Sequence, residues 1–185
     1  MKGLKEGKVQ NQQASSTAET MVMYRAAETM QPEDQRVCND PLAIHFLSPQ
    51  MLGRFKNPLR RAIVRWVMNH VYPGVNGAVV ARVRFIDDYL NACIKKGLEQ
   101  LVIIGAGYDT RAYRFNFPDN GLRVFEVDQQ ATQQVKSSKL KSFLTDIPGH
   151  VNFVSVDIEK DKLKDKLLAA VTMQTKRPCS LWRGW

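Results

Sequence analysis

The spacing of apolar positions changes near residue 98 and divides the chain into two differently patterned parts. Before that point, apolar side chains recur every three or four positions between turn signals, which predicts amphipathic helices with one buried face each. Two helices are predicted most clearly, the first by Leu59, Ala62, Ile63, Trp66 and Val67, the second by Val79, Val83, Ile86, Leu90 and Ile94. Gly97 follows the second pattern and is the expected C-cap.

Capping residues predict where the helices begin. Ser16, with Glu19 three residues later, fits a capping box. Asp40 and Asn57 each precede a proline, which is the arrangement of an N-cap with proline in the first turn. Residues 1–14 are polar and aperiodic, so we expect a flexible tail there.

Further along the chain, short continuous apolar runs alternate with helical segments, and such runs are typical of parallel strands buried on both faces. Strands are predicted at 101–104, 123–127 and 151–156, and helical segments near 110–114, 129–143 and 160–168. Alternation of strand and helix predicts a parallel, right-handed α/β unit. The predicted fold is α/β, with an N-terminal helical cap over residues 15–98 and the first strands of a Rossmann-like parallel sheet over residues 99–185.

Composition and charge narrow the function classes. The 44% hydrophobic and 24% charged content is ordinary for a soluble globular protein. No apolar run approaches the roughly 18 residues of a membrane span, and no secretory signal is visible, so we expect a cytoplasmic protein with no membrane partner. The net charge of +9 is spread along the chain without interleaved aromatic residues, so a nucleic-acid partner is not expected.

Residues that hold metals or act as nucleophiles do not cluster in this sequence. The cysteines and histidines are scattered singly: Cys38, Cys93, Cys179, His45, His70 and His150. Because neither CxxC spacing nor a Ser/His/Asp set is present, we expect no metal site and identify no catalytic residue.

A glycine turn and a carboxylate supply the candidate chemistry. The first predicted strand runs directly into Gly105 and Gly107, and glycines there let the backbone turn sharply and approach a ligand near the N–H groups of the next helix. Asp128 ends the second predicted strand, 21 positions after Gly107. A carboxylate about 20 residues after such a turn holds the ribose hydroxyls of a bound nucleoside. Glu126, on the same strand face, is the alternative carboxylate.

A nucleotide-dependent oxidoreductase is one class that shares these two features. Against it, Thr110 stands where the dinucleotide-binding GxGxxG pattern has its third glycine. In addition, a long helical region precedes the first predicted strand, whereas most dinucleotide-binding domains begin near that strand.

Several stretches resemble one family, the bacterial branch of the leucine carboxyl methyltransferases: Ala81–Asp88, Val102–Phe115, Val124–Gln129, and, in its N-terminal helices, Arg25–Thr29 and Asn39–Ala43. The match spans about residues 20 to 160, and the run GAGYDTRAYRF is specific to this family rather than to Rossmann folds at large. The resemblance implies a class I methyltransferase sheet with S-adenosyl-L-methionine as cofactor. It also implies that Gly105 admits the cofactor, that Asp128 holds its ribose, and that Asp157 and Ile158 frame its adenine.

Arg82 stands at the family's Ala-Arg-Val position, and the resemblance implies that its guanidinium pairs with the methionyl carboxylate of the cofactor. Arg84 is close enough in sequence to compete for this role. The implied reaction is O-methyl transfer to an unidentified carboxyl or hydroxyl acceptor, either a small molecule or a protein C-terminal carboxylate. Such a displacement needs orientation and a dry site more than acid–base groups. Tyr108, Arg111 and Arg114 are expected to pack the first helix rather than face the substrate.

The end of the chain departs from the family's pattern. The family continues into a fourth strand that ends in a Glu-Gly motif, whereas the residues from about 174 to 185 show neither strand alternation nor an apolar run. Their back-translated codons, shifted two bases forward, permit an apolar run followed by Glu-Gly-Val. We therefore expect a frame-shifted end to a longer gene and a truncated fold, which resequencing the locus tests. A truncated, non-catalytic remnant with partial cofactor binding is the alternative function.

Overall fold

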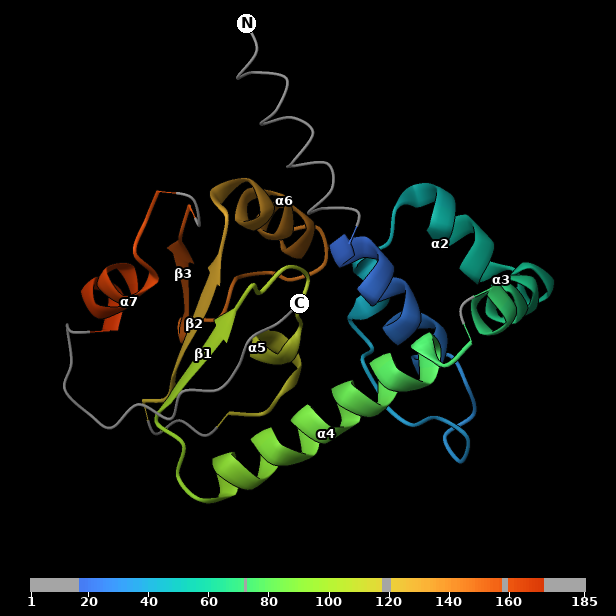
Figure 1. The fold of residues 1–185 in the computed structure, drawn as a ribbon, viewed down its shortest axis with the longest axis horizontal. Helices are drawn as coiled ribbons and strands as arrows, with labels where there is room; N and C mark the ends of the chain where they lie inside the picture. The colour runs from blue at the N-terminus through green and yellow to red at the C-terminus, as the bar shows by residue number, and fades with distance from the viewer. Residues whose placement is uncertain (1–16, 72, 118–120, 158–159, 172–185) are drawn as a thin grey trace, which may run out of the picture. The chain divides into compact units, whose positions relative to one another are not determined.

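The structure is a computed structural model that describes residues 17–71, 73–117, 121–157 and 160–171 (Figure 1). The described residues fall into two compact units, 17–91 and 92–171. The first unit is built from helices and the second around a parallel sheet. The α/β fold class predicted from the sequence is therefore confirmed. The predicted tail at 1–14 and the predicted aberrant end from about 174 lie outside the described residues.

The first unit contains helical residues 17–29, the 3₁₀ helix η1 (Ala43–Phe46) and the α-helices α2 (Pro49–Lys56), α3 (Pro58–Val71) and most of α4 (Val75–Lys95). Its core consists of buried apolar side chains from these elements: Val22, Tyr24, Phe46, Phe55, Met68, Val79, Val80, Val83, Ile86 and Leu90. Four of the five residues that the sequence predicted to face inward on α4, Val79, Val83, Ile86 and Leu90, are buried, and the fifth, Ile94, is half-buried, so that prediction is confirmed.

Of the helix starts that the sequence predicted, the one at Asn57 is confirmed and the one at Asp40 is wrong. Asn57 caps α3 as predicted, because its Oδ1 accepts hydrogen bonds from the N–H groups of Leu59 at 3.0 Å and Arg60 at 3.1 Å. No α-helix begins at Asp40, because the segment that follows it forms only the short 3₁₀ helix η1. The buried Asp40 carboxylate instead pairs with Arg25 at 2.9 Å.

Two further helix starts concern residues near the N-terminus. Helix α2 was not predicted, although Ser48 precedes a proline as Asn57 does, and Ser48 Oγ accepts from Met51 N–H at 3.4 Å. The proposed capping box at Ser16 lies outside the described residues, and its partner Glu19 accepts a hydrogen bond from Ser48 N–H at 2.8 Å.

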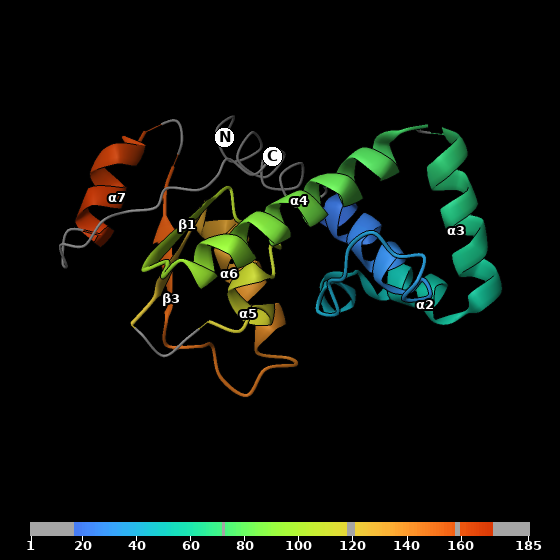
Figure 2. The same ribbon diagram turned by 90° about the horizontal axis from the view of Figure 1, so that it is seen from below.

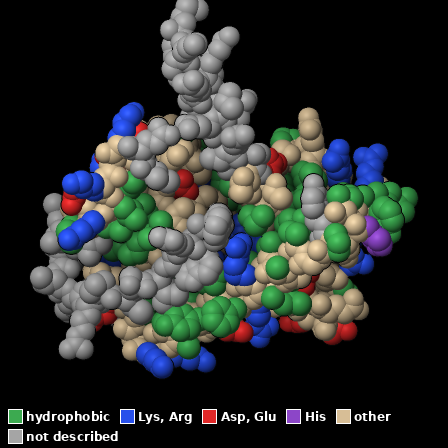
Figure 3. All heavy atoms as spheres, viewed as in Figure 1, with side chains coloured by type: hydrophobic (Ala, Val, Ile, Leu, Met, Phe, Trp, Pro, Cys, Tyr) green, Lys and Arg blue, Asp and Glu red, His purple; other side chains and the backbone are tan. Residues whose placement is uncertain are grey.

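The apolar face predicted for α3 is not the face that is buried. Within its own unit this helix buries Met68, whereas Leu59 is 71% exposed and Trp66 61% exposed. In Figure 3 hydrophobic side chains lie on the surface over α3, with Lys and Arg beside them. Periodicity shows that a helix has an apolar face but does not show what covers that face. The eight-residue α2 packs against α3, and Met68 is the buried residue of α3.

The second unit is a three-stranded parallel sheet with helices between its strands (Figures 1 and 2). In chain order it consists of β1 (Gln100–Ile104), α5 (Arg111–Arg114), β2 (Arg123–Asp128), α6 (Gln130–Leu140), β3 (Val151–Ser155) and α7 (Leu163–Val171). The strand order is β1-β2-β3, with Ile104 opposite Val127 and Asp128 opposite Ser155. The three predicted strands are confirmed to within one residue at each end.

The two faces of this sheet are chemically different. On one face Phe125 and Val127 belong to an apolar cluster, against which Leu167 of α7 packs. On the opposite face the strand residues alternate with these, and Glu126 points toward side chains of α5 and α6.

Gly97 ends α4 as predicted, with φ +84° and its N–H donating to the carbonyl of Ile94 at 3.0 Å. Among the described helices, none is long and apolar enough to cross a membrane.

Candidate functional site

The turn after β1 is held in a shape that favours glycine. Gly105 has φ +64° and Gly107 has φ +44°, both in the left-handed region where a side chain costs about 1–2 kcal/mol. The N–H of Ala106, between them, donates to the carbonyl of Val127 at 3.0 Å and so fastens the turn to β2. The exposed Gly105 leaves the backbone at the carboxyl end of β1 open to close approach.

Asp128, the carboxylate that follows Gly107 by 21 positions, contacts this turn. Its Oδ2 accepts a hydrogen bond from Gly107 N–H at 2.5 Å, and its Oδ1 accepts from Gln129 N–H at 2.7 Å. An ionised carboxylate has about four acceptor positions. Because Asp128 is only half-buried, acceptor capacity is left for donors from a ligand. The structure therefore joins the last residue of β2 to the glycine turn after β1.

Glu126, the alternative carboxylate, does not share this position. Its side chain is fully buried, its Oε2 lies 2.7 Å from Lys136 Nζ, and it accepts a hydrogen bond from the Tyr113 hydroxyl at 3.1 Å. Burial raises the pKa of Glu126, and this effect outweighs the opposing influence of Lys136. A carboxylate enclosed in this way cannot reach ribose hydroxyls, so the alternative is wrong.

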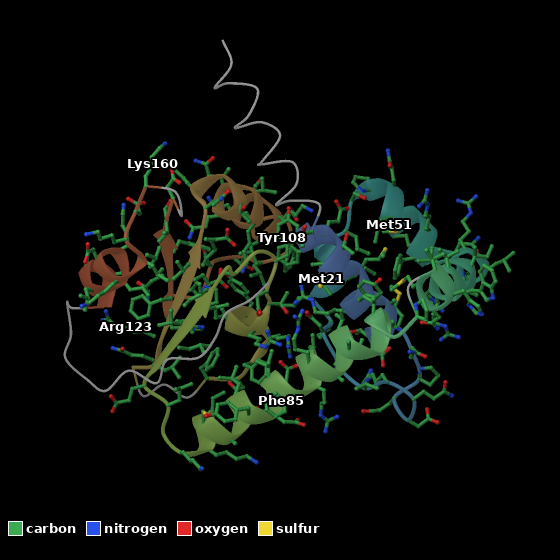
Figure 4. All side chains as sticks on the ribbon, in the orientation of Figure 1. Met21, Met51, Phe85, Tyr108, Arg123 and Lys160 are labelled. Carbon is green, nitrogen blue, oxygen red and sulfur yellow. The ribbon has the colours of Figure 1, made fainter. Side chains whose placement is uncertain are left out.

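The segment between the glycine turn and α5 is tightly packed. Tyr108 is 4% exposed, and Lys139 Nζ lies 4.7 Å above the centre of its ring (Figure 4 labels Tyr108). Arg111 is also buried and pairs with Asp109. These contacts confirm that Tyr108 and Arg111 pack. Helix α5 is a single turn of four residues, so its dipole adds less to the site than the sequence suggested.

Asp157 follows β3 at the same edge of the sheet. Its side chain is 47% exposed and lies 3.3 Å from Lys160 Nζ. The N–H of Val156, the residue before it, donates to the carbonyl of Asp128 at 3.0 Å, so the backbones after β2 and β3 are joined directly. Ile158, its predicted partner, lies outside the described residues.

Arg82 belongs to the first unit, where it lies on α4 and is half-buried. Its Nη2 lies 3.8 Å from Met21 Sδ (Figure 4 labels Met21), a weak contact for a guanidinium, and within the described residues it has no carboxylate partner. Arg84 instead pairs with Asp88 at 2.7 Å on an exposed stretch of the same helix. Of the two arginines, Arg82 is the one left available for an anionic group.

Within the described part of the chain, no group of three or more His, Cys, Asp or Glu side chains is arranged to hold a metal ion. The groups that are present at adjacent strand ends, backbone N–H donors of the glycine turn and partly exposed carboxylate acceptors, suit a nucleoside. In open parallel sheets, ligands bind beyond the carboxyl ends of the strands. The fold defines an α/β protein of the Rossmann-like class, and this edge of its sheet is the candidate nucleoside site.

Comparison with known proteins narrows that class. The profile of the leucine carboxyl methyltransferase family matches residues 18–184, and the chain belongs to this family. The chain is also similar to curated bacterial proteins that are named as proposed S-adenosyl-L-methionine-dependent methyltransferases.

These relatives are substantially longer than the chain. YktD of Bacillus subtilis is 36% identical over 138 residues, which cover 75% of this chain and 44% of the relative. A protein of Frankia alni is 33% identical over 135 residues, 73% of this chain and 46% of the relative. One from Streptomyces avermitilis is 32% identical over 153 residues, 79% of this chain and 50% of the relative. The chain thus spans about half the length of the curated relatives it matches.

Proposed function

We propose that this chain provides the S-adenosyl-L-methionine-binding part of a methyltransferase. The observation that carries the proposal is the hydrogen bond between Gly107 N–H and Asp128 Oδ2 at the carboxyl edge of the sheet. It fixes a carboxylate beside an open glycine turn, where a nucleoside of the family's cofactor can lie against the backbone. Family membership supports S-adenosyl-L-methionine over other nucleosides.

Each candidate residue then has a defined task. Gly105 and Gly107 admit the cofactor to the backbone, and Asp128 accepts hydrogen bonds from its ribose hydroxyls. Asp157, with Ile158, frames the adenine. Arg82 pairs with the methionyl carboxylate, a role supported by its lack of a carboxylate partner among the described residues.

The cofactor supplies a methyl group bound to a positively charged sulfur. We propose that the acceptor is a carboxyl or hydroxyl oxygen of a small molecule or of a protein C-terminus. The described part of the site contributes orientation rather than proton transfer, since its carboxylates are already engaged with backbone N–H groups or Lys160. We further propose that the protein acts in the cytoplasm.

Thermal unfolding with and without ligand tests the proposal. S-adenosylhomocysteine at about 100 times its Kd should stabilise the chain by roughly 2.7 kcal/mol and raise its Tm, whereas NADH should not. Asp128→Ala should abolish the shift. Asp146→Ala, which removes an exposed aspartate elsewhere in the same unit, is the matched control and should retain it. A cooperative transition that S-adenosylhomocysteine leaves unmoved would refute cofactor binding, and a shift with NADH would favour the oxidoreductase.

A further inference from the structure

A buried polar cluster lies behind the glycine turn, on the α5 and α6 side of the sheet. It consists of Tyr113 on α5, Glu126 on β2 and Lys136 on α6. Glu126 is fully enclosed and Lys136 is 1% exposed, so neither charge is solvated. Three successive elements of the chain thus contribute to one small, buried polar centre.

The contacts in this cluster converge on one atom. Glu126 Oε2 lies 2.7 Å from Lys136 Nζ and accepts a hydrogen bond from the Tyr113 hydroxyl at 3.1 Å. Lys136 Nζ also lies 5.3 Å from the centre of the Tyr113 ring. The other carboxylate oxygen, Oε1, has no hydrogen-bond partner among the described residues. A pair selected for stability alone would satisfy both oxygens or be replaced by apolar side chains.

The cluster is linked to both components of the proposed cofactor site. Glu126 stands two residues before Asp128 on β2, and Tyr113 stands six residues after Gly107 on the first turn beyond the glycine loop. The loop between Gly107 and Tyr113 is therefore anchored at one end by Asp128 and at the other by Glu126.

Helix α6 contacts the same loop a second time. Lys139, one turn after Lys136, places its Nζ 4.7 Å above the ring of Tyr108. Gln133, one turn before Lys136, donates to the carbonyls of Glu126 at 3.0 Å and Val154 at 2.9 Å. One face of α6 thus contacts β2, β3 and the glycine loop at successive turns.

We propose that Tyr113 is a positioning residue for cofactor binding: its hydroxyl, held by the buried Glu126 carboxyl group, sets the glycine loop against Asp128. This inference rests on the proposed function and deepens it. The hydroxyl acts through Glu126 and the loop, not by contact with the ligand. Supporting groups of this kind hold binding atoms in register, because small displacements of a loop weaken the hydrogen bonds that it makes to a ligand.

The test removes one oxygen atom. Tyr113→Phe keeps the ring and its contact with Lys136 but loses the hydrogen bond to Glu126. We expect its Kd for S-adenosylhomocysteine, measured by calorimetric titration, to rise about tenfold, as loss of a hydrogen bond to a charged group allows. Tyr24→Phe removes the same atom from a buried tyrosine of the other unit and should leave Kd unchanged.

A second variant separates positioning from general stability. Glu126→Gln with Lys136→Met removes both charges yet keeps an acceptor oxygen for the Tyr113 hydroxyl. If the hydrogen bond positions the loop, this double variant retains a Kd near that of the wild type. A loss equal to that of Tyr113→Phe would overturn the assignment, as would a Tyr113→Phe variant that binds as well as the wild type.

A spectroscopic measurement keeps the inference distinct from the proposed function. In the unliganded full chain, Tyr113→Phe should shift the NMR signal of the Gly107 amide, which donates to Asp128, and speed its hydrogen exchange. If the wild type fails to bind S-adenosylhomocysteine, the proposed function fails. An unchanged Gly107 amide in Tyr113→Phe would instead refute the positioning role, whether or not the ligand binds.

Discussion

The buried ion pair in the second unit allows a quantitative prediction about stability. Replacing Lys136 with Met preserves most of the volume of the side chain but removes the cation 2.7 Å from Glu126 Oε2. Side-chain exposure at the two positions is 2% and 0%, so water cannot take the place of the lost partner. Removing one member of a buried pair costs about 3–5 kcal/mol, because a desolvated charge is left behind.

That loss is large enough to measure by thermal unfolding. For a chain of this size each kcal/mol shifts Tm by about 2–4 °C. Lys136→Met should therefore melt roughly 6–20 °C below the wild type at neutral pH. The double variant, Glu126→Gln with Lys136→Met, should recover most of the loss, because neither charge is then buried alone.

A lysine in an exposed ion pair is the matched control, because it separates the effect of burial from the loss of an ion pair as such. Lys166 Nζ lies 3.3 Å from Asp161 Oδ2, but the lysine side chain is 47% exposed. Exposed pairs contribute about 0–1 kcal/mol, so Lys166→Met should change Tm by only a few degrees. If Lys136→Met were no more destabilising than Lys166→Met, or if the double variant were as unstable as the single one, the charge-burial reasoning would be refuted.

Two further predictions concern pH and the exposed face of α3. Burial raises the pKa of Glu126 above its ordinary value of 4.5, so its contribution to stability is complete below that value and is lost as pH rises through the raised pKa. The Tm of the wild type minus the Tm of Glu126→Gln should therefore be larger at acid pH than at neutral pH. Melting scans in which this Tm difference is the same at both pH values would contradict the prediction. Leu59→Gln with Ile63→Gln should change the free energy of unfolding in urea by less than about 1 kcal/mol, whereas Phe55→Ala should lose about 3–5 kcal/mol. Equal losses would show that the α3 face is buried in solution.

The sequence was sufficient to predict the structure where local sequence signals are combined with a regular parallel crossover between strands. Strand β1 runs into the glycine turn and Asp128 closes β2, and a parallel crossover brings consecutive strand ends to the same edge. Gly107 and Asp128, 21 positions apart in the sequence, therefore lie at the same edge and are joined by a hydrogen bond of 2.5 Å.

The sequence was insufficient to predict the structure where a residue distant along the chain determines what a side chain contacts. Asp40 carries the signature of a helix cap, but a buried Arg25 takes its carboxylate. The apolar stripe of α3 was correctly recognised as a stripe, yet Leu59 and Trp66 lie on the exposed side of the helix. Periodicity fixes which residues share a face, and only tertiary packing fixes which face is covered.

The buried cluster is a different kind of omission, because the sequence does carry a signal for it. Glu126 interrupts an otherwise apolar strand that is buried on both faces, and an enclosed carboxyl group requires a partner. On the next helix, Gln133, Lys136 and Leu140 recur at helical spacing and are all buried, so Lys136 is the cation that falls on the covered face. An acid within a buried strand, followed by a base on the covered face of the next helix, predicts a buried pair from sequence alone. Such a pair adds little net stability. Glu126 stands two residues before Asp128 on β2, and Asp128 contacts the glycine turn. For this reason we assign the pair a role in positioning the site rather than in stabilising the fold.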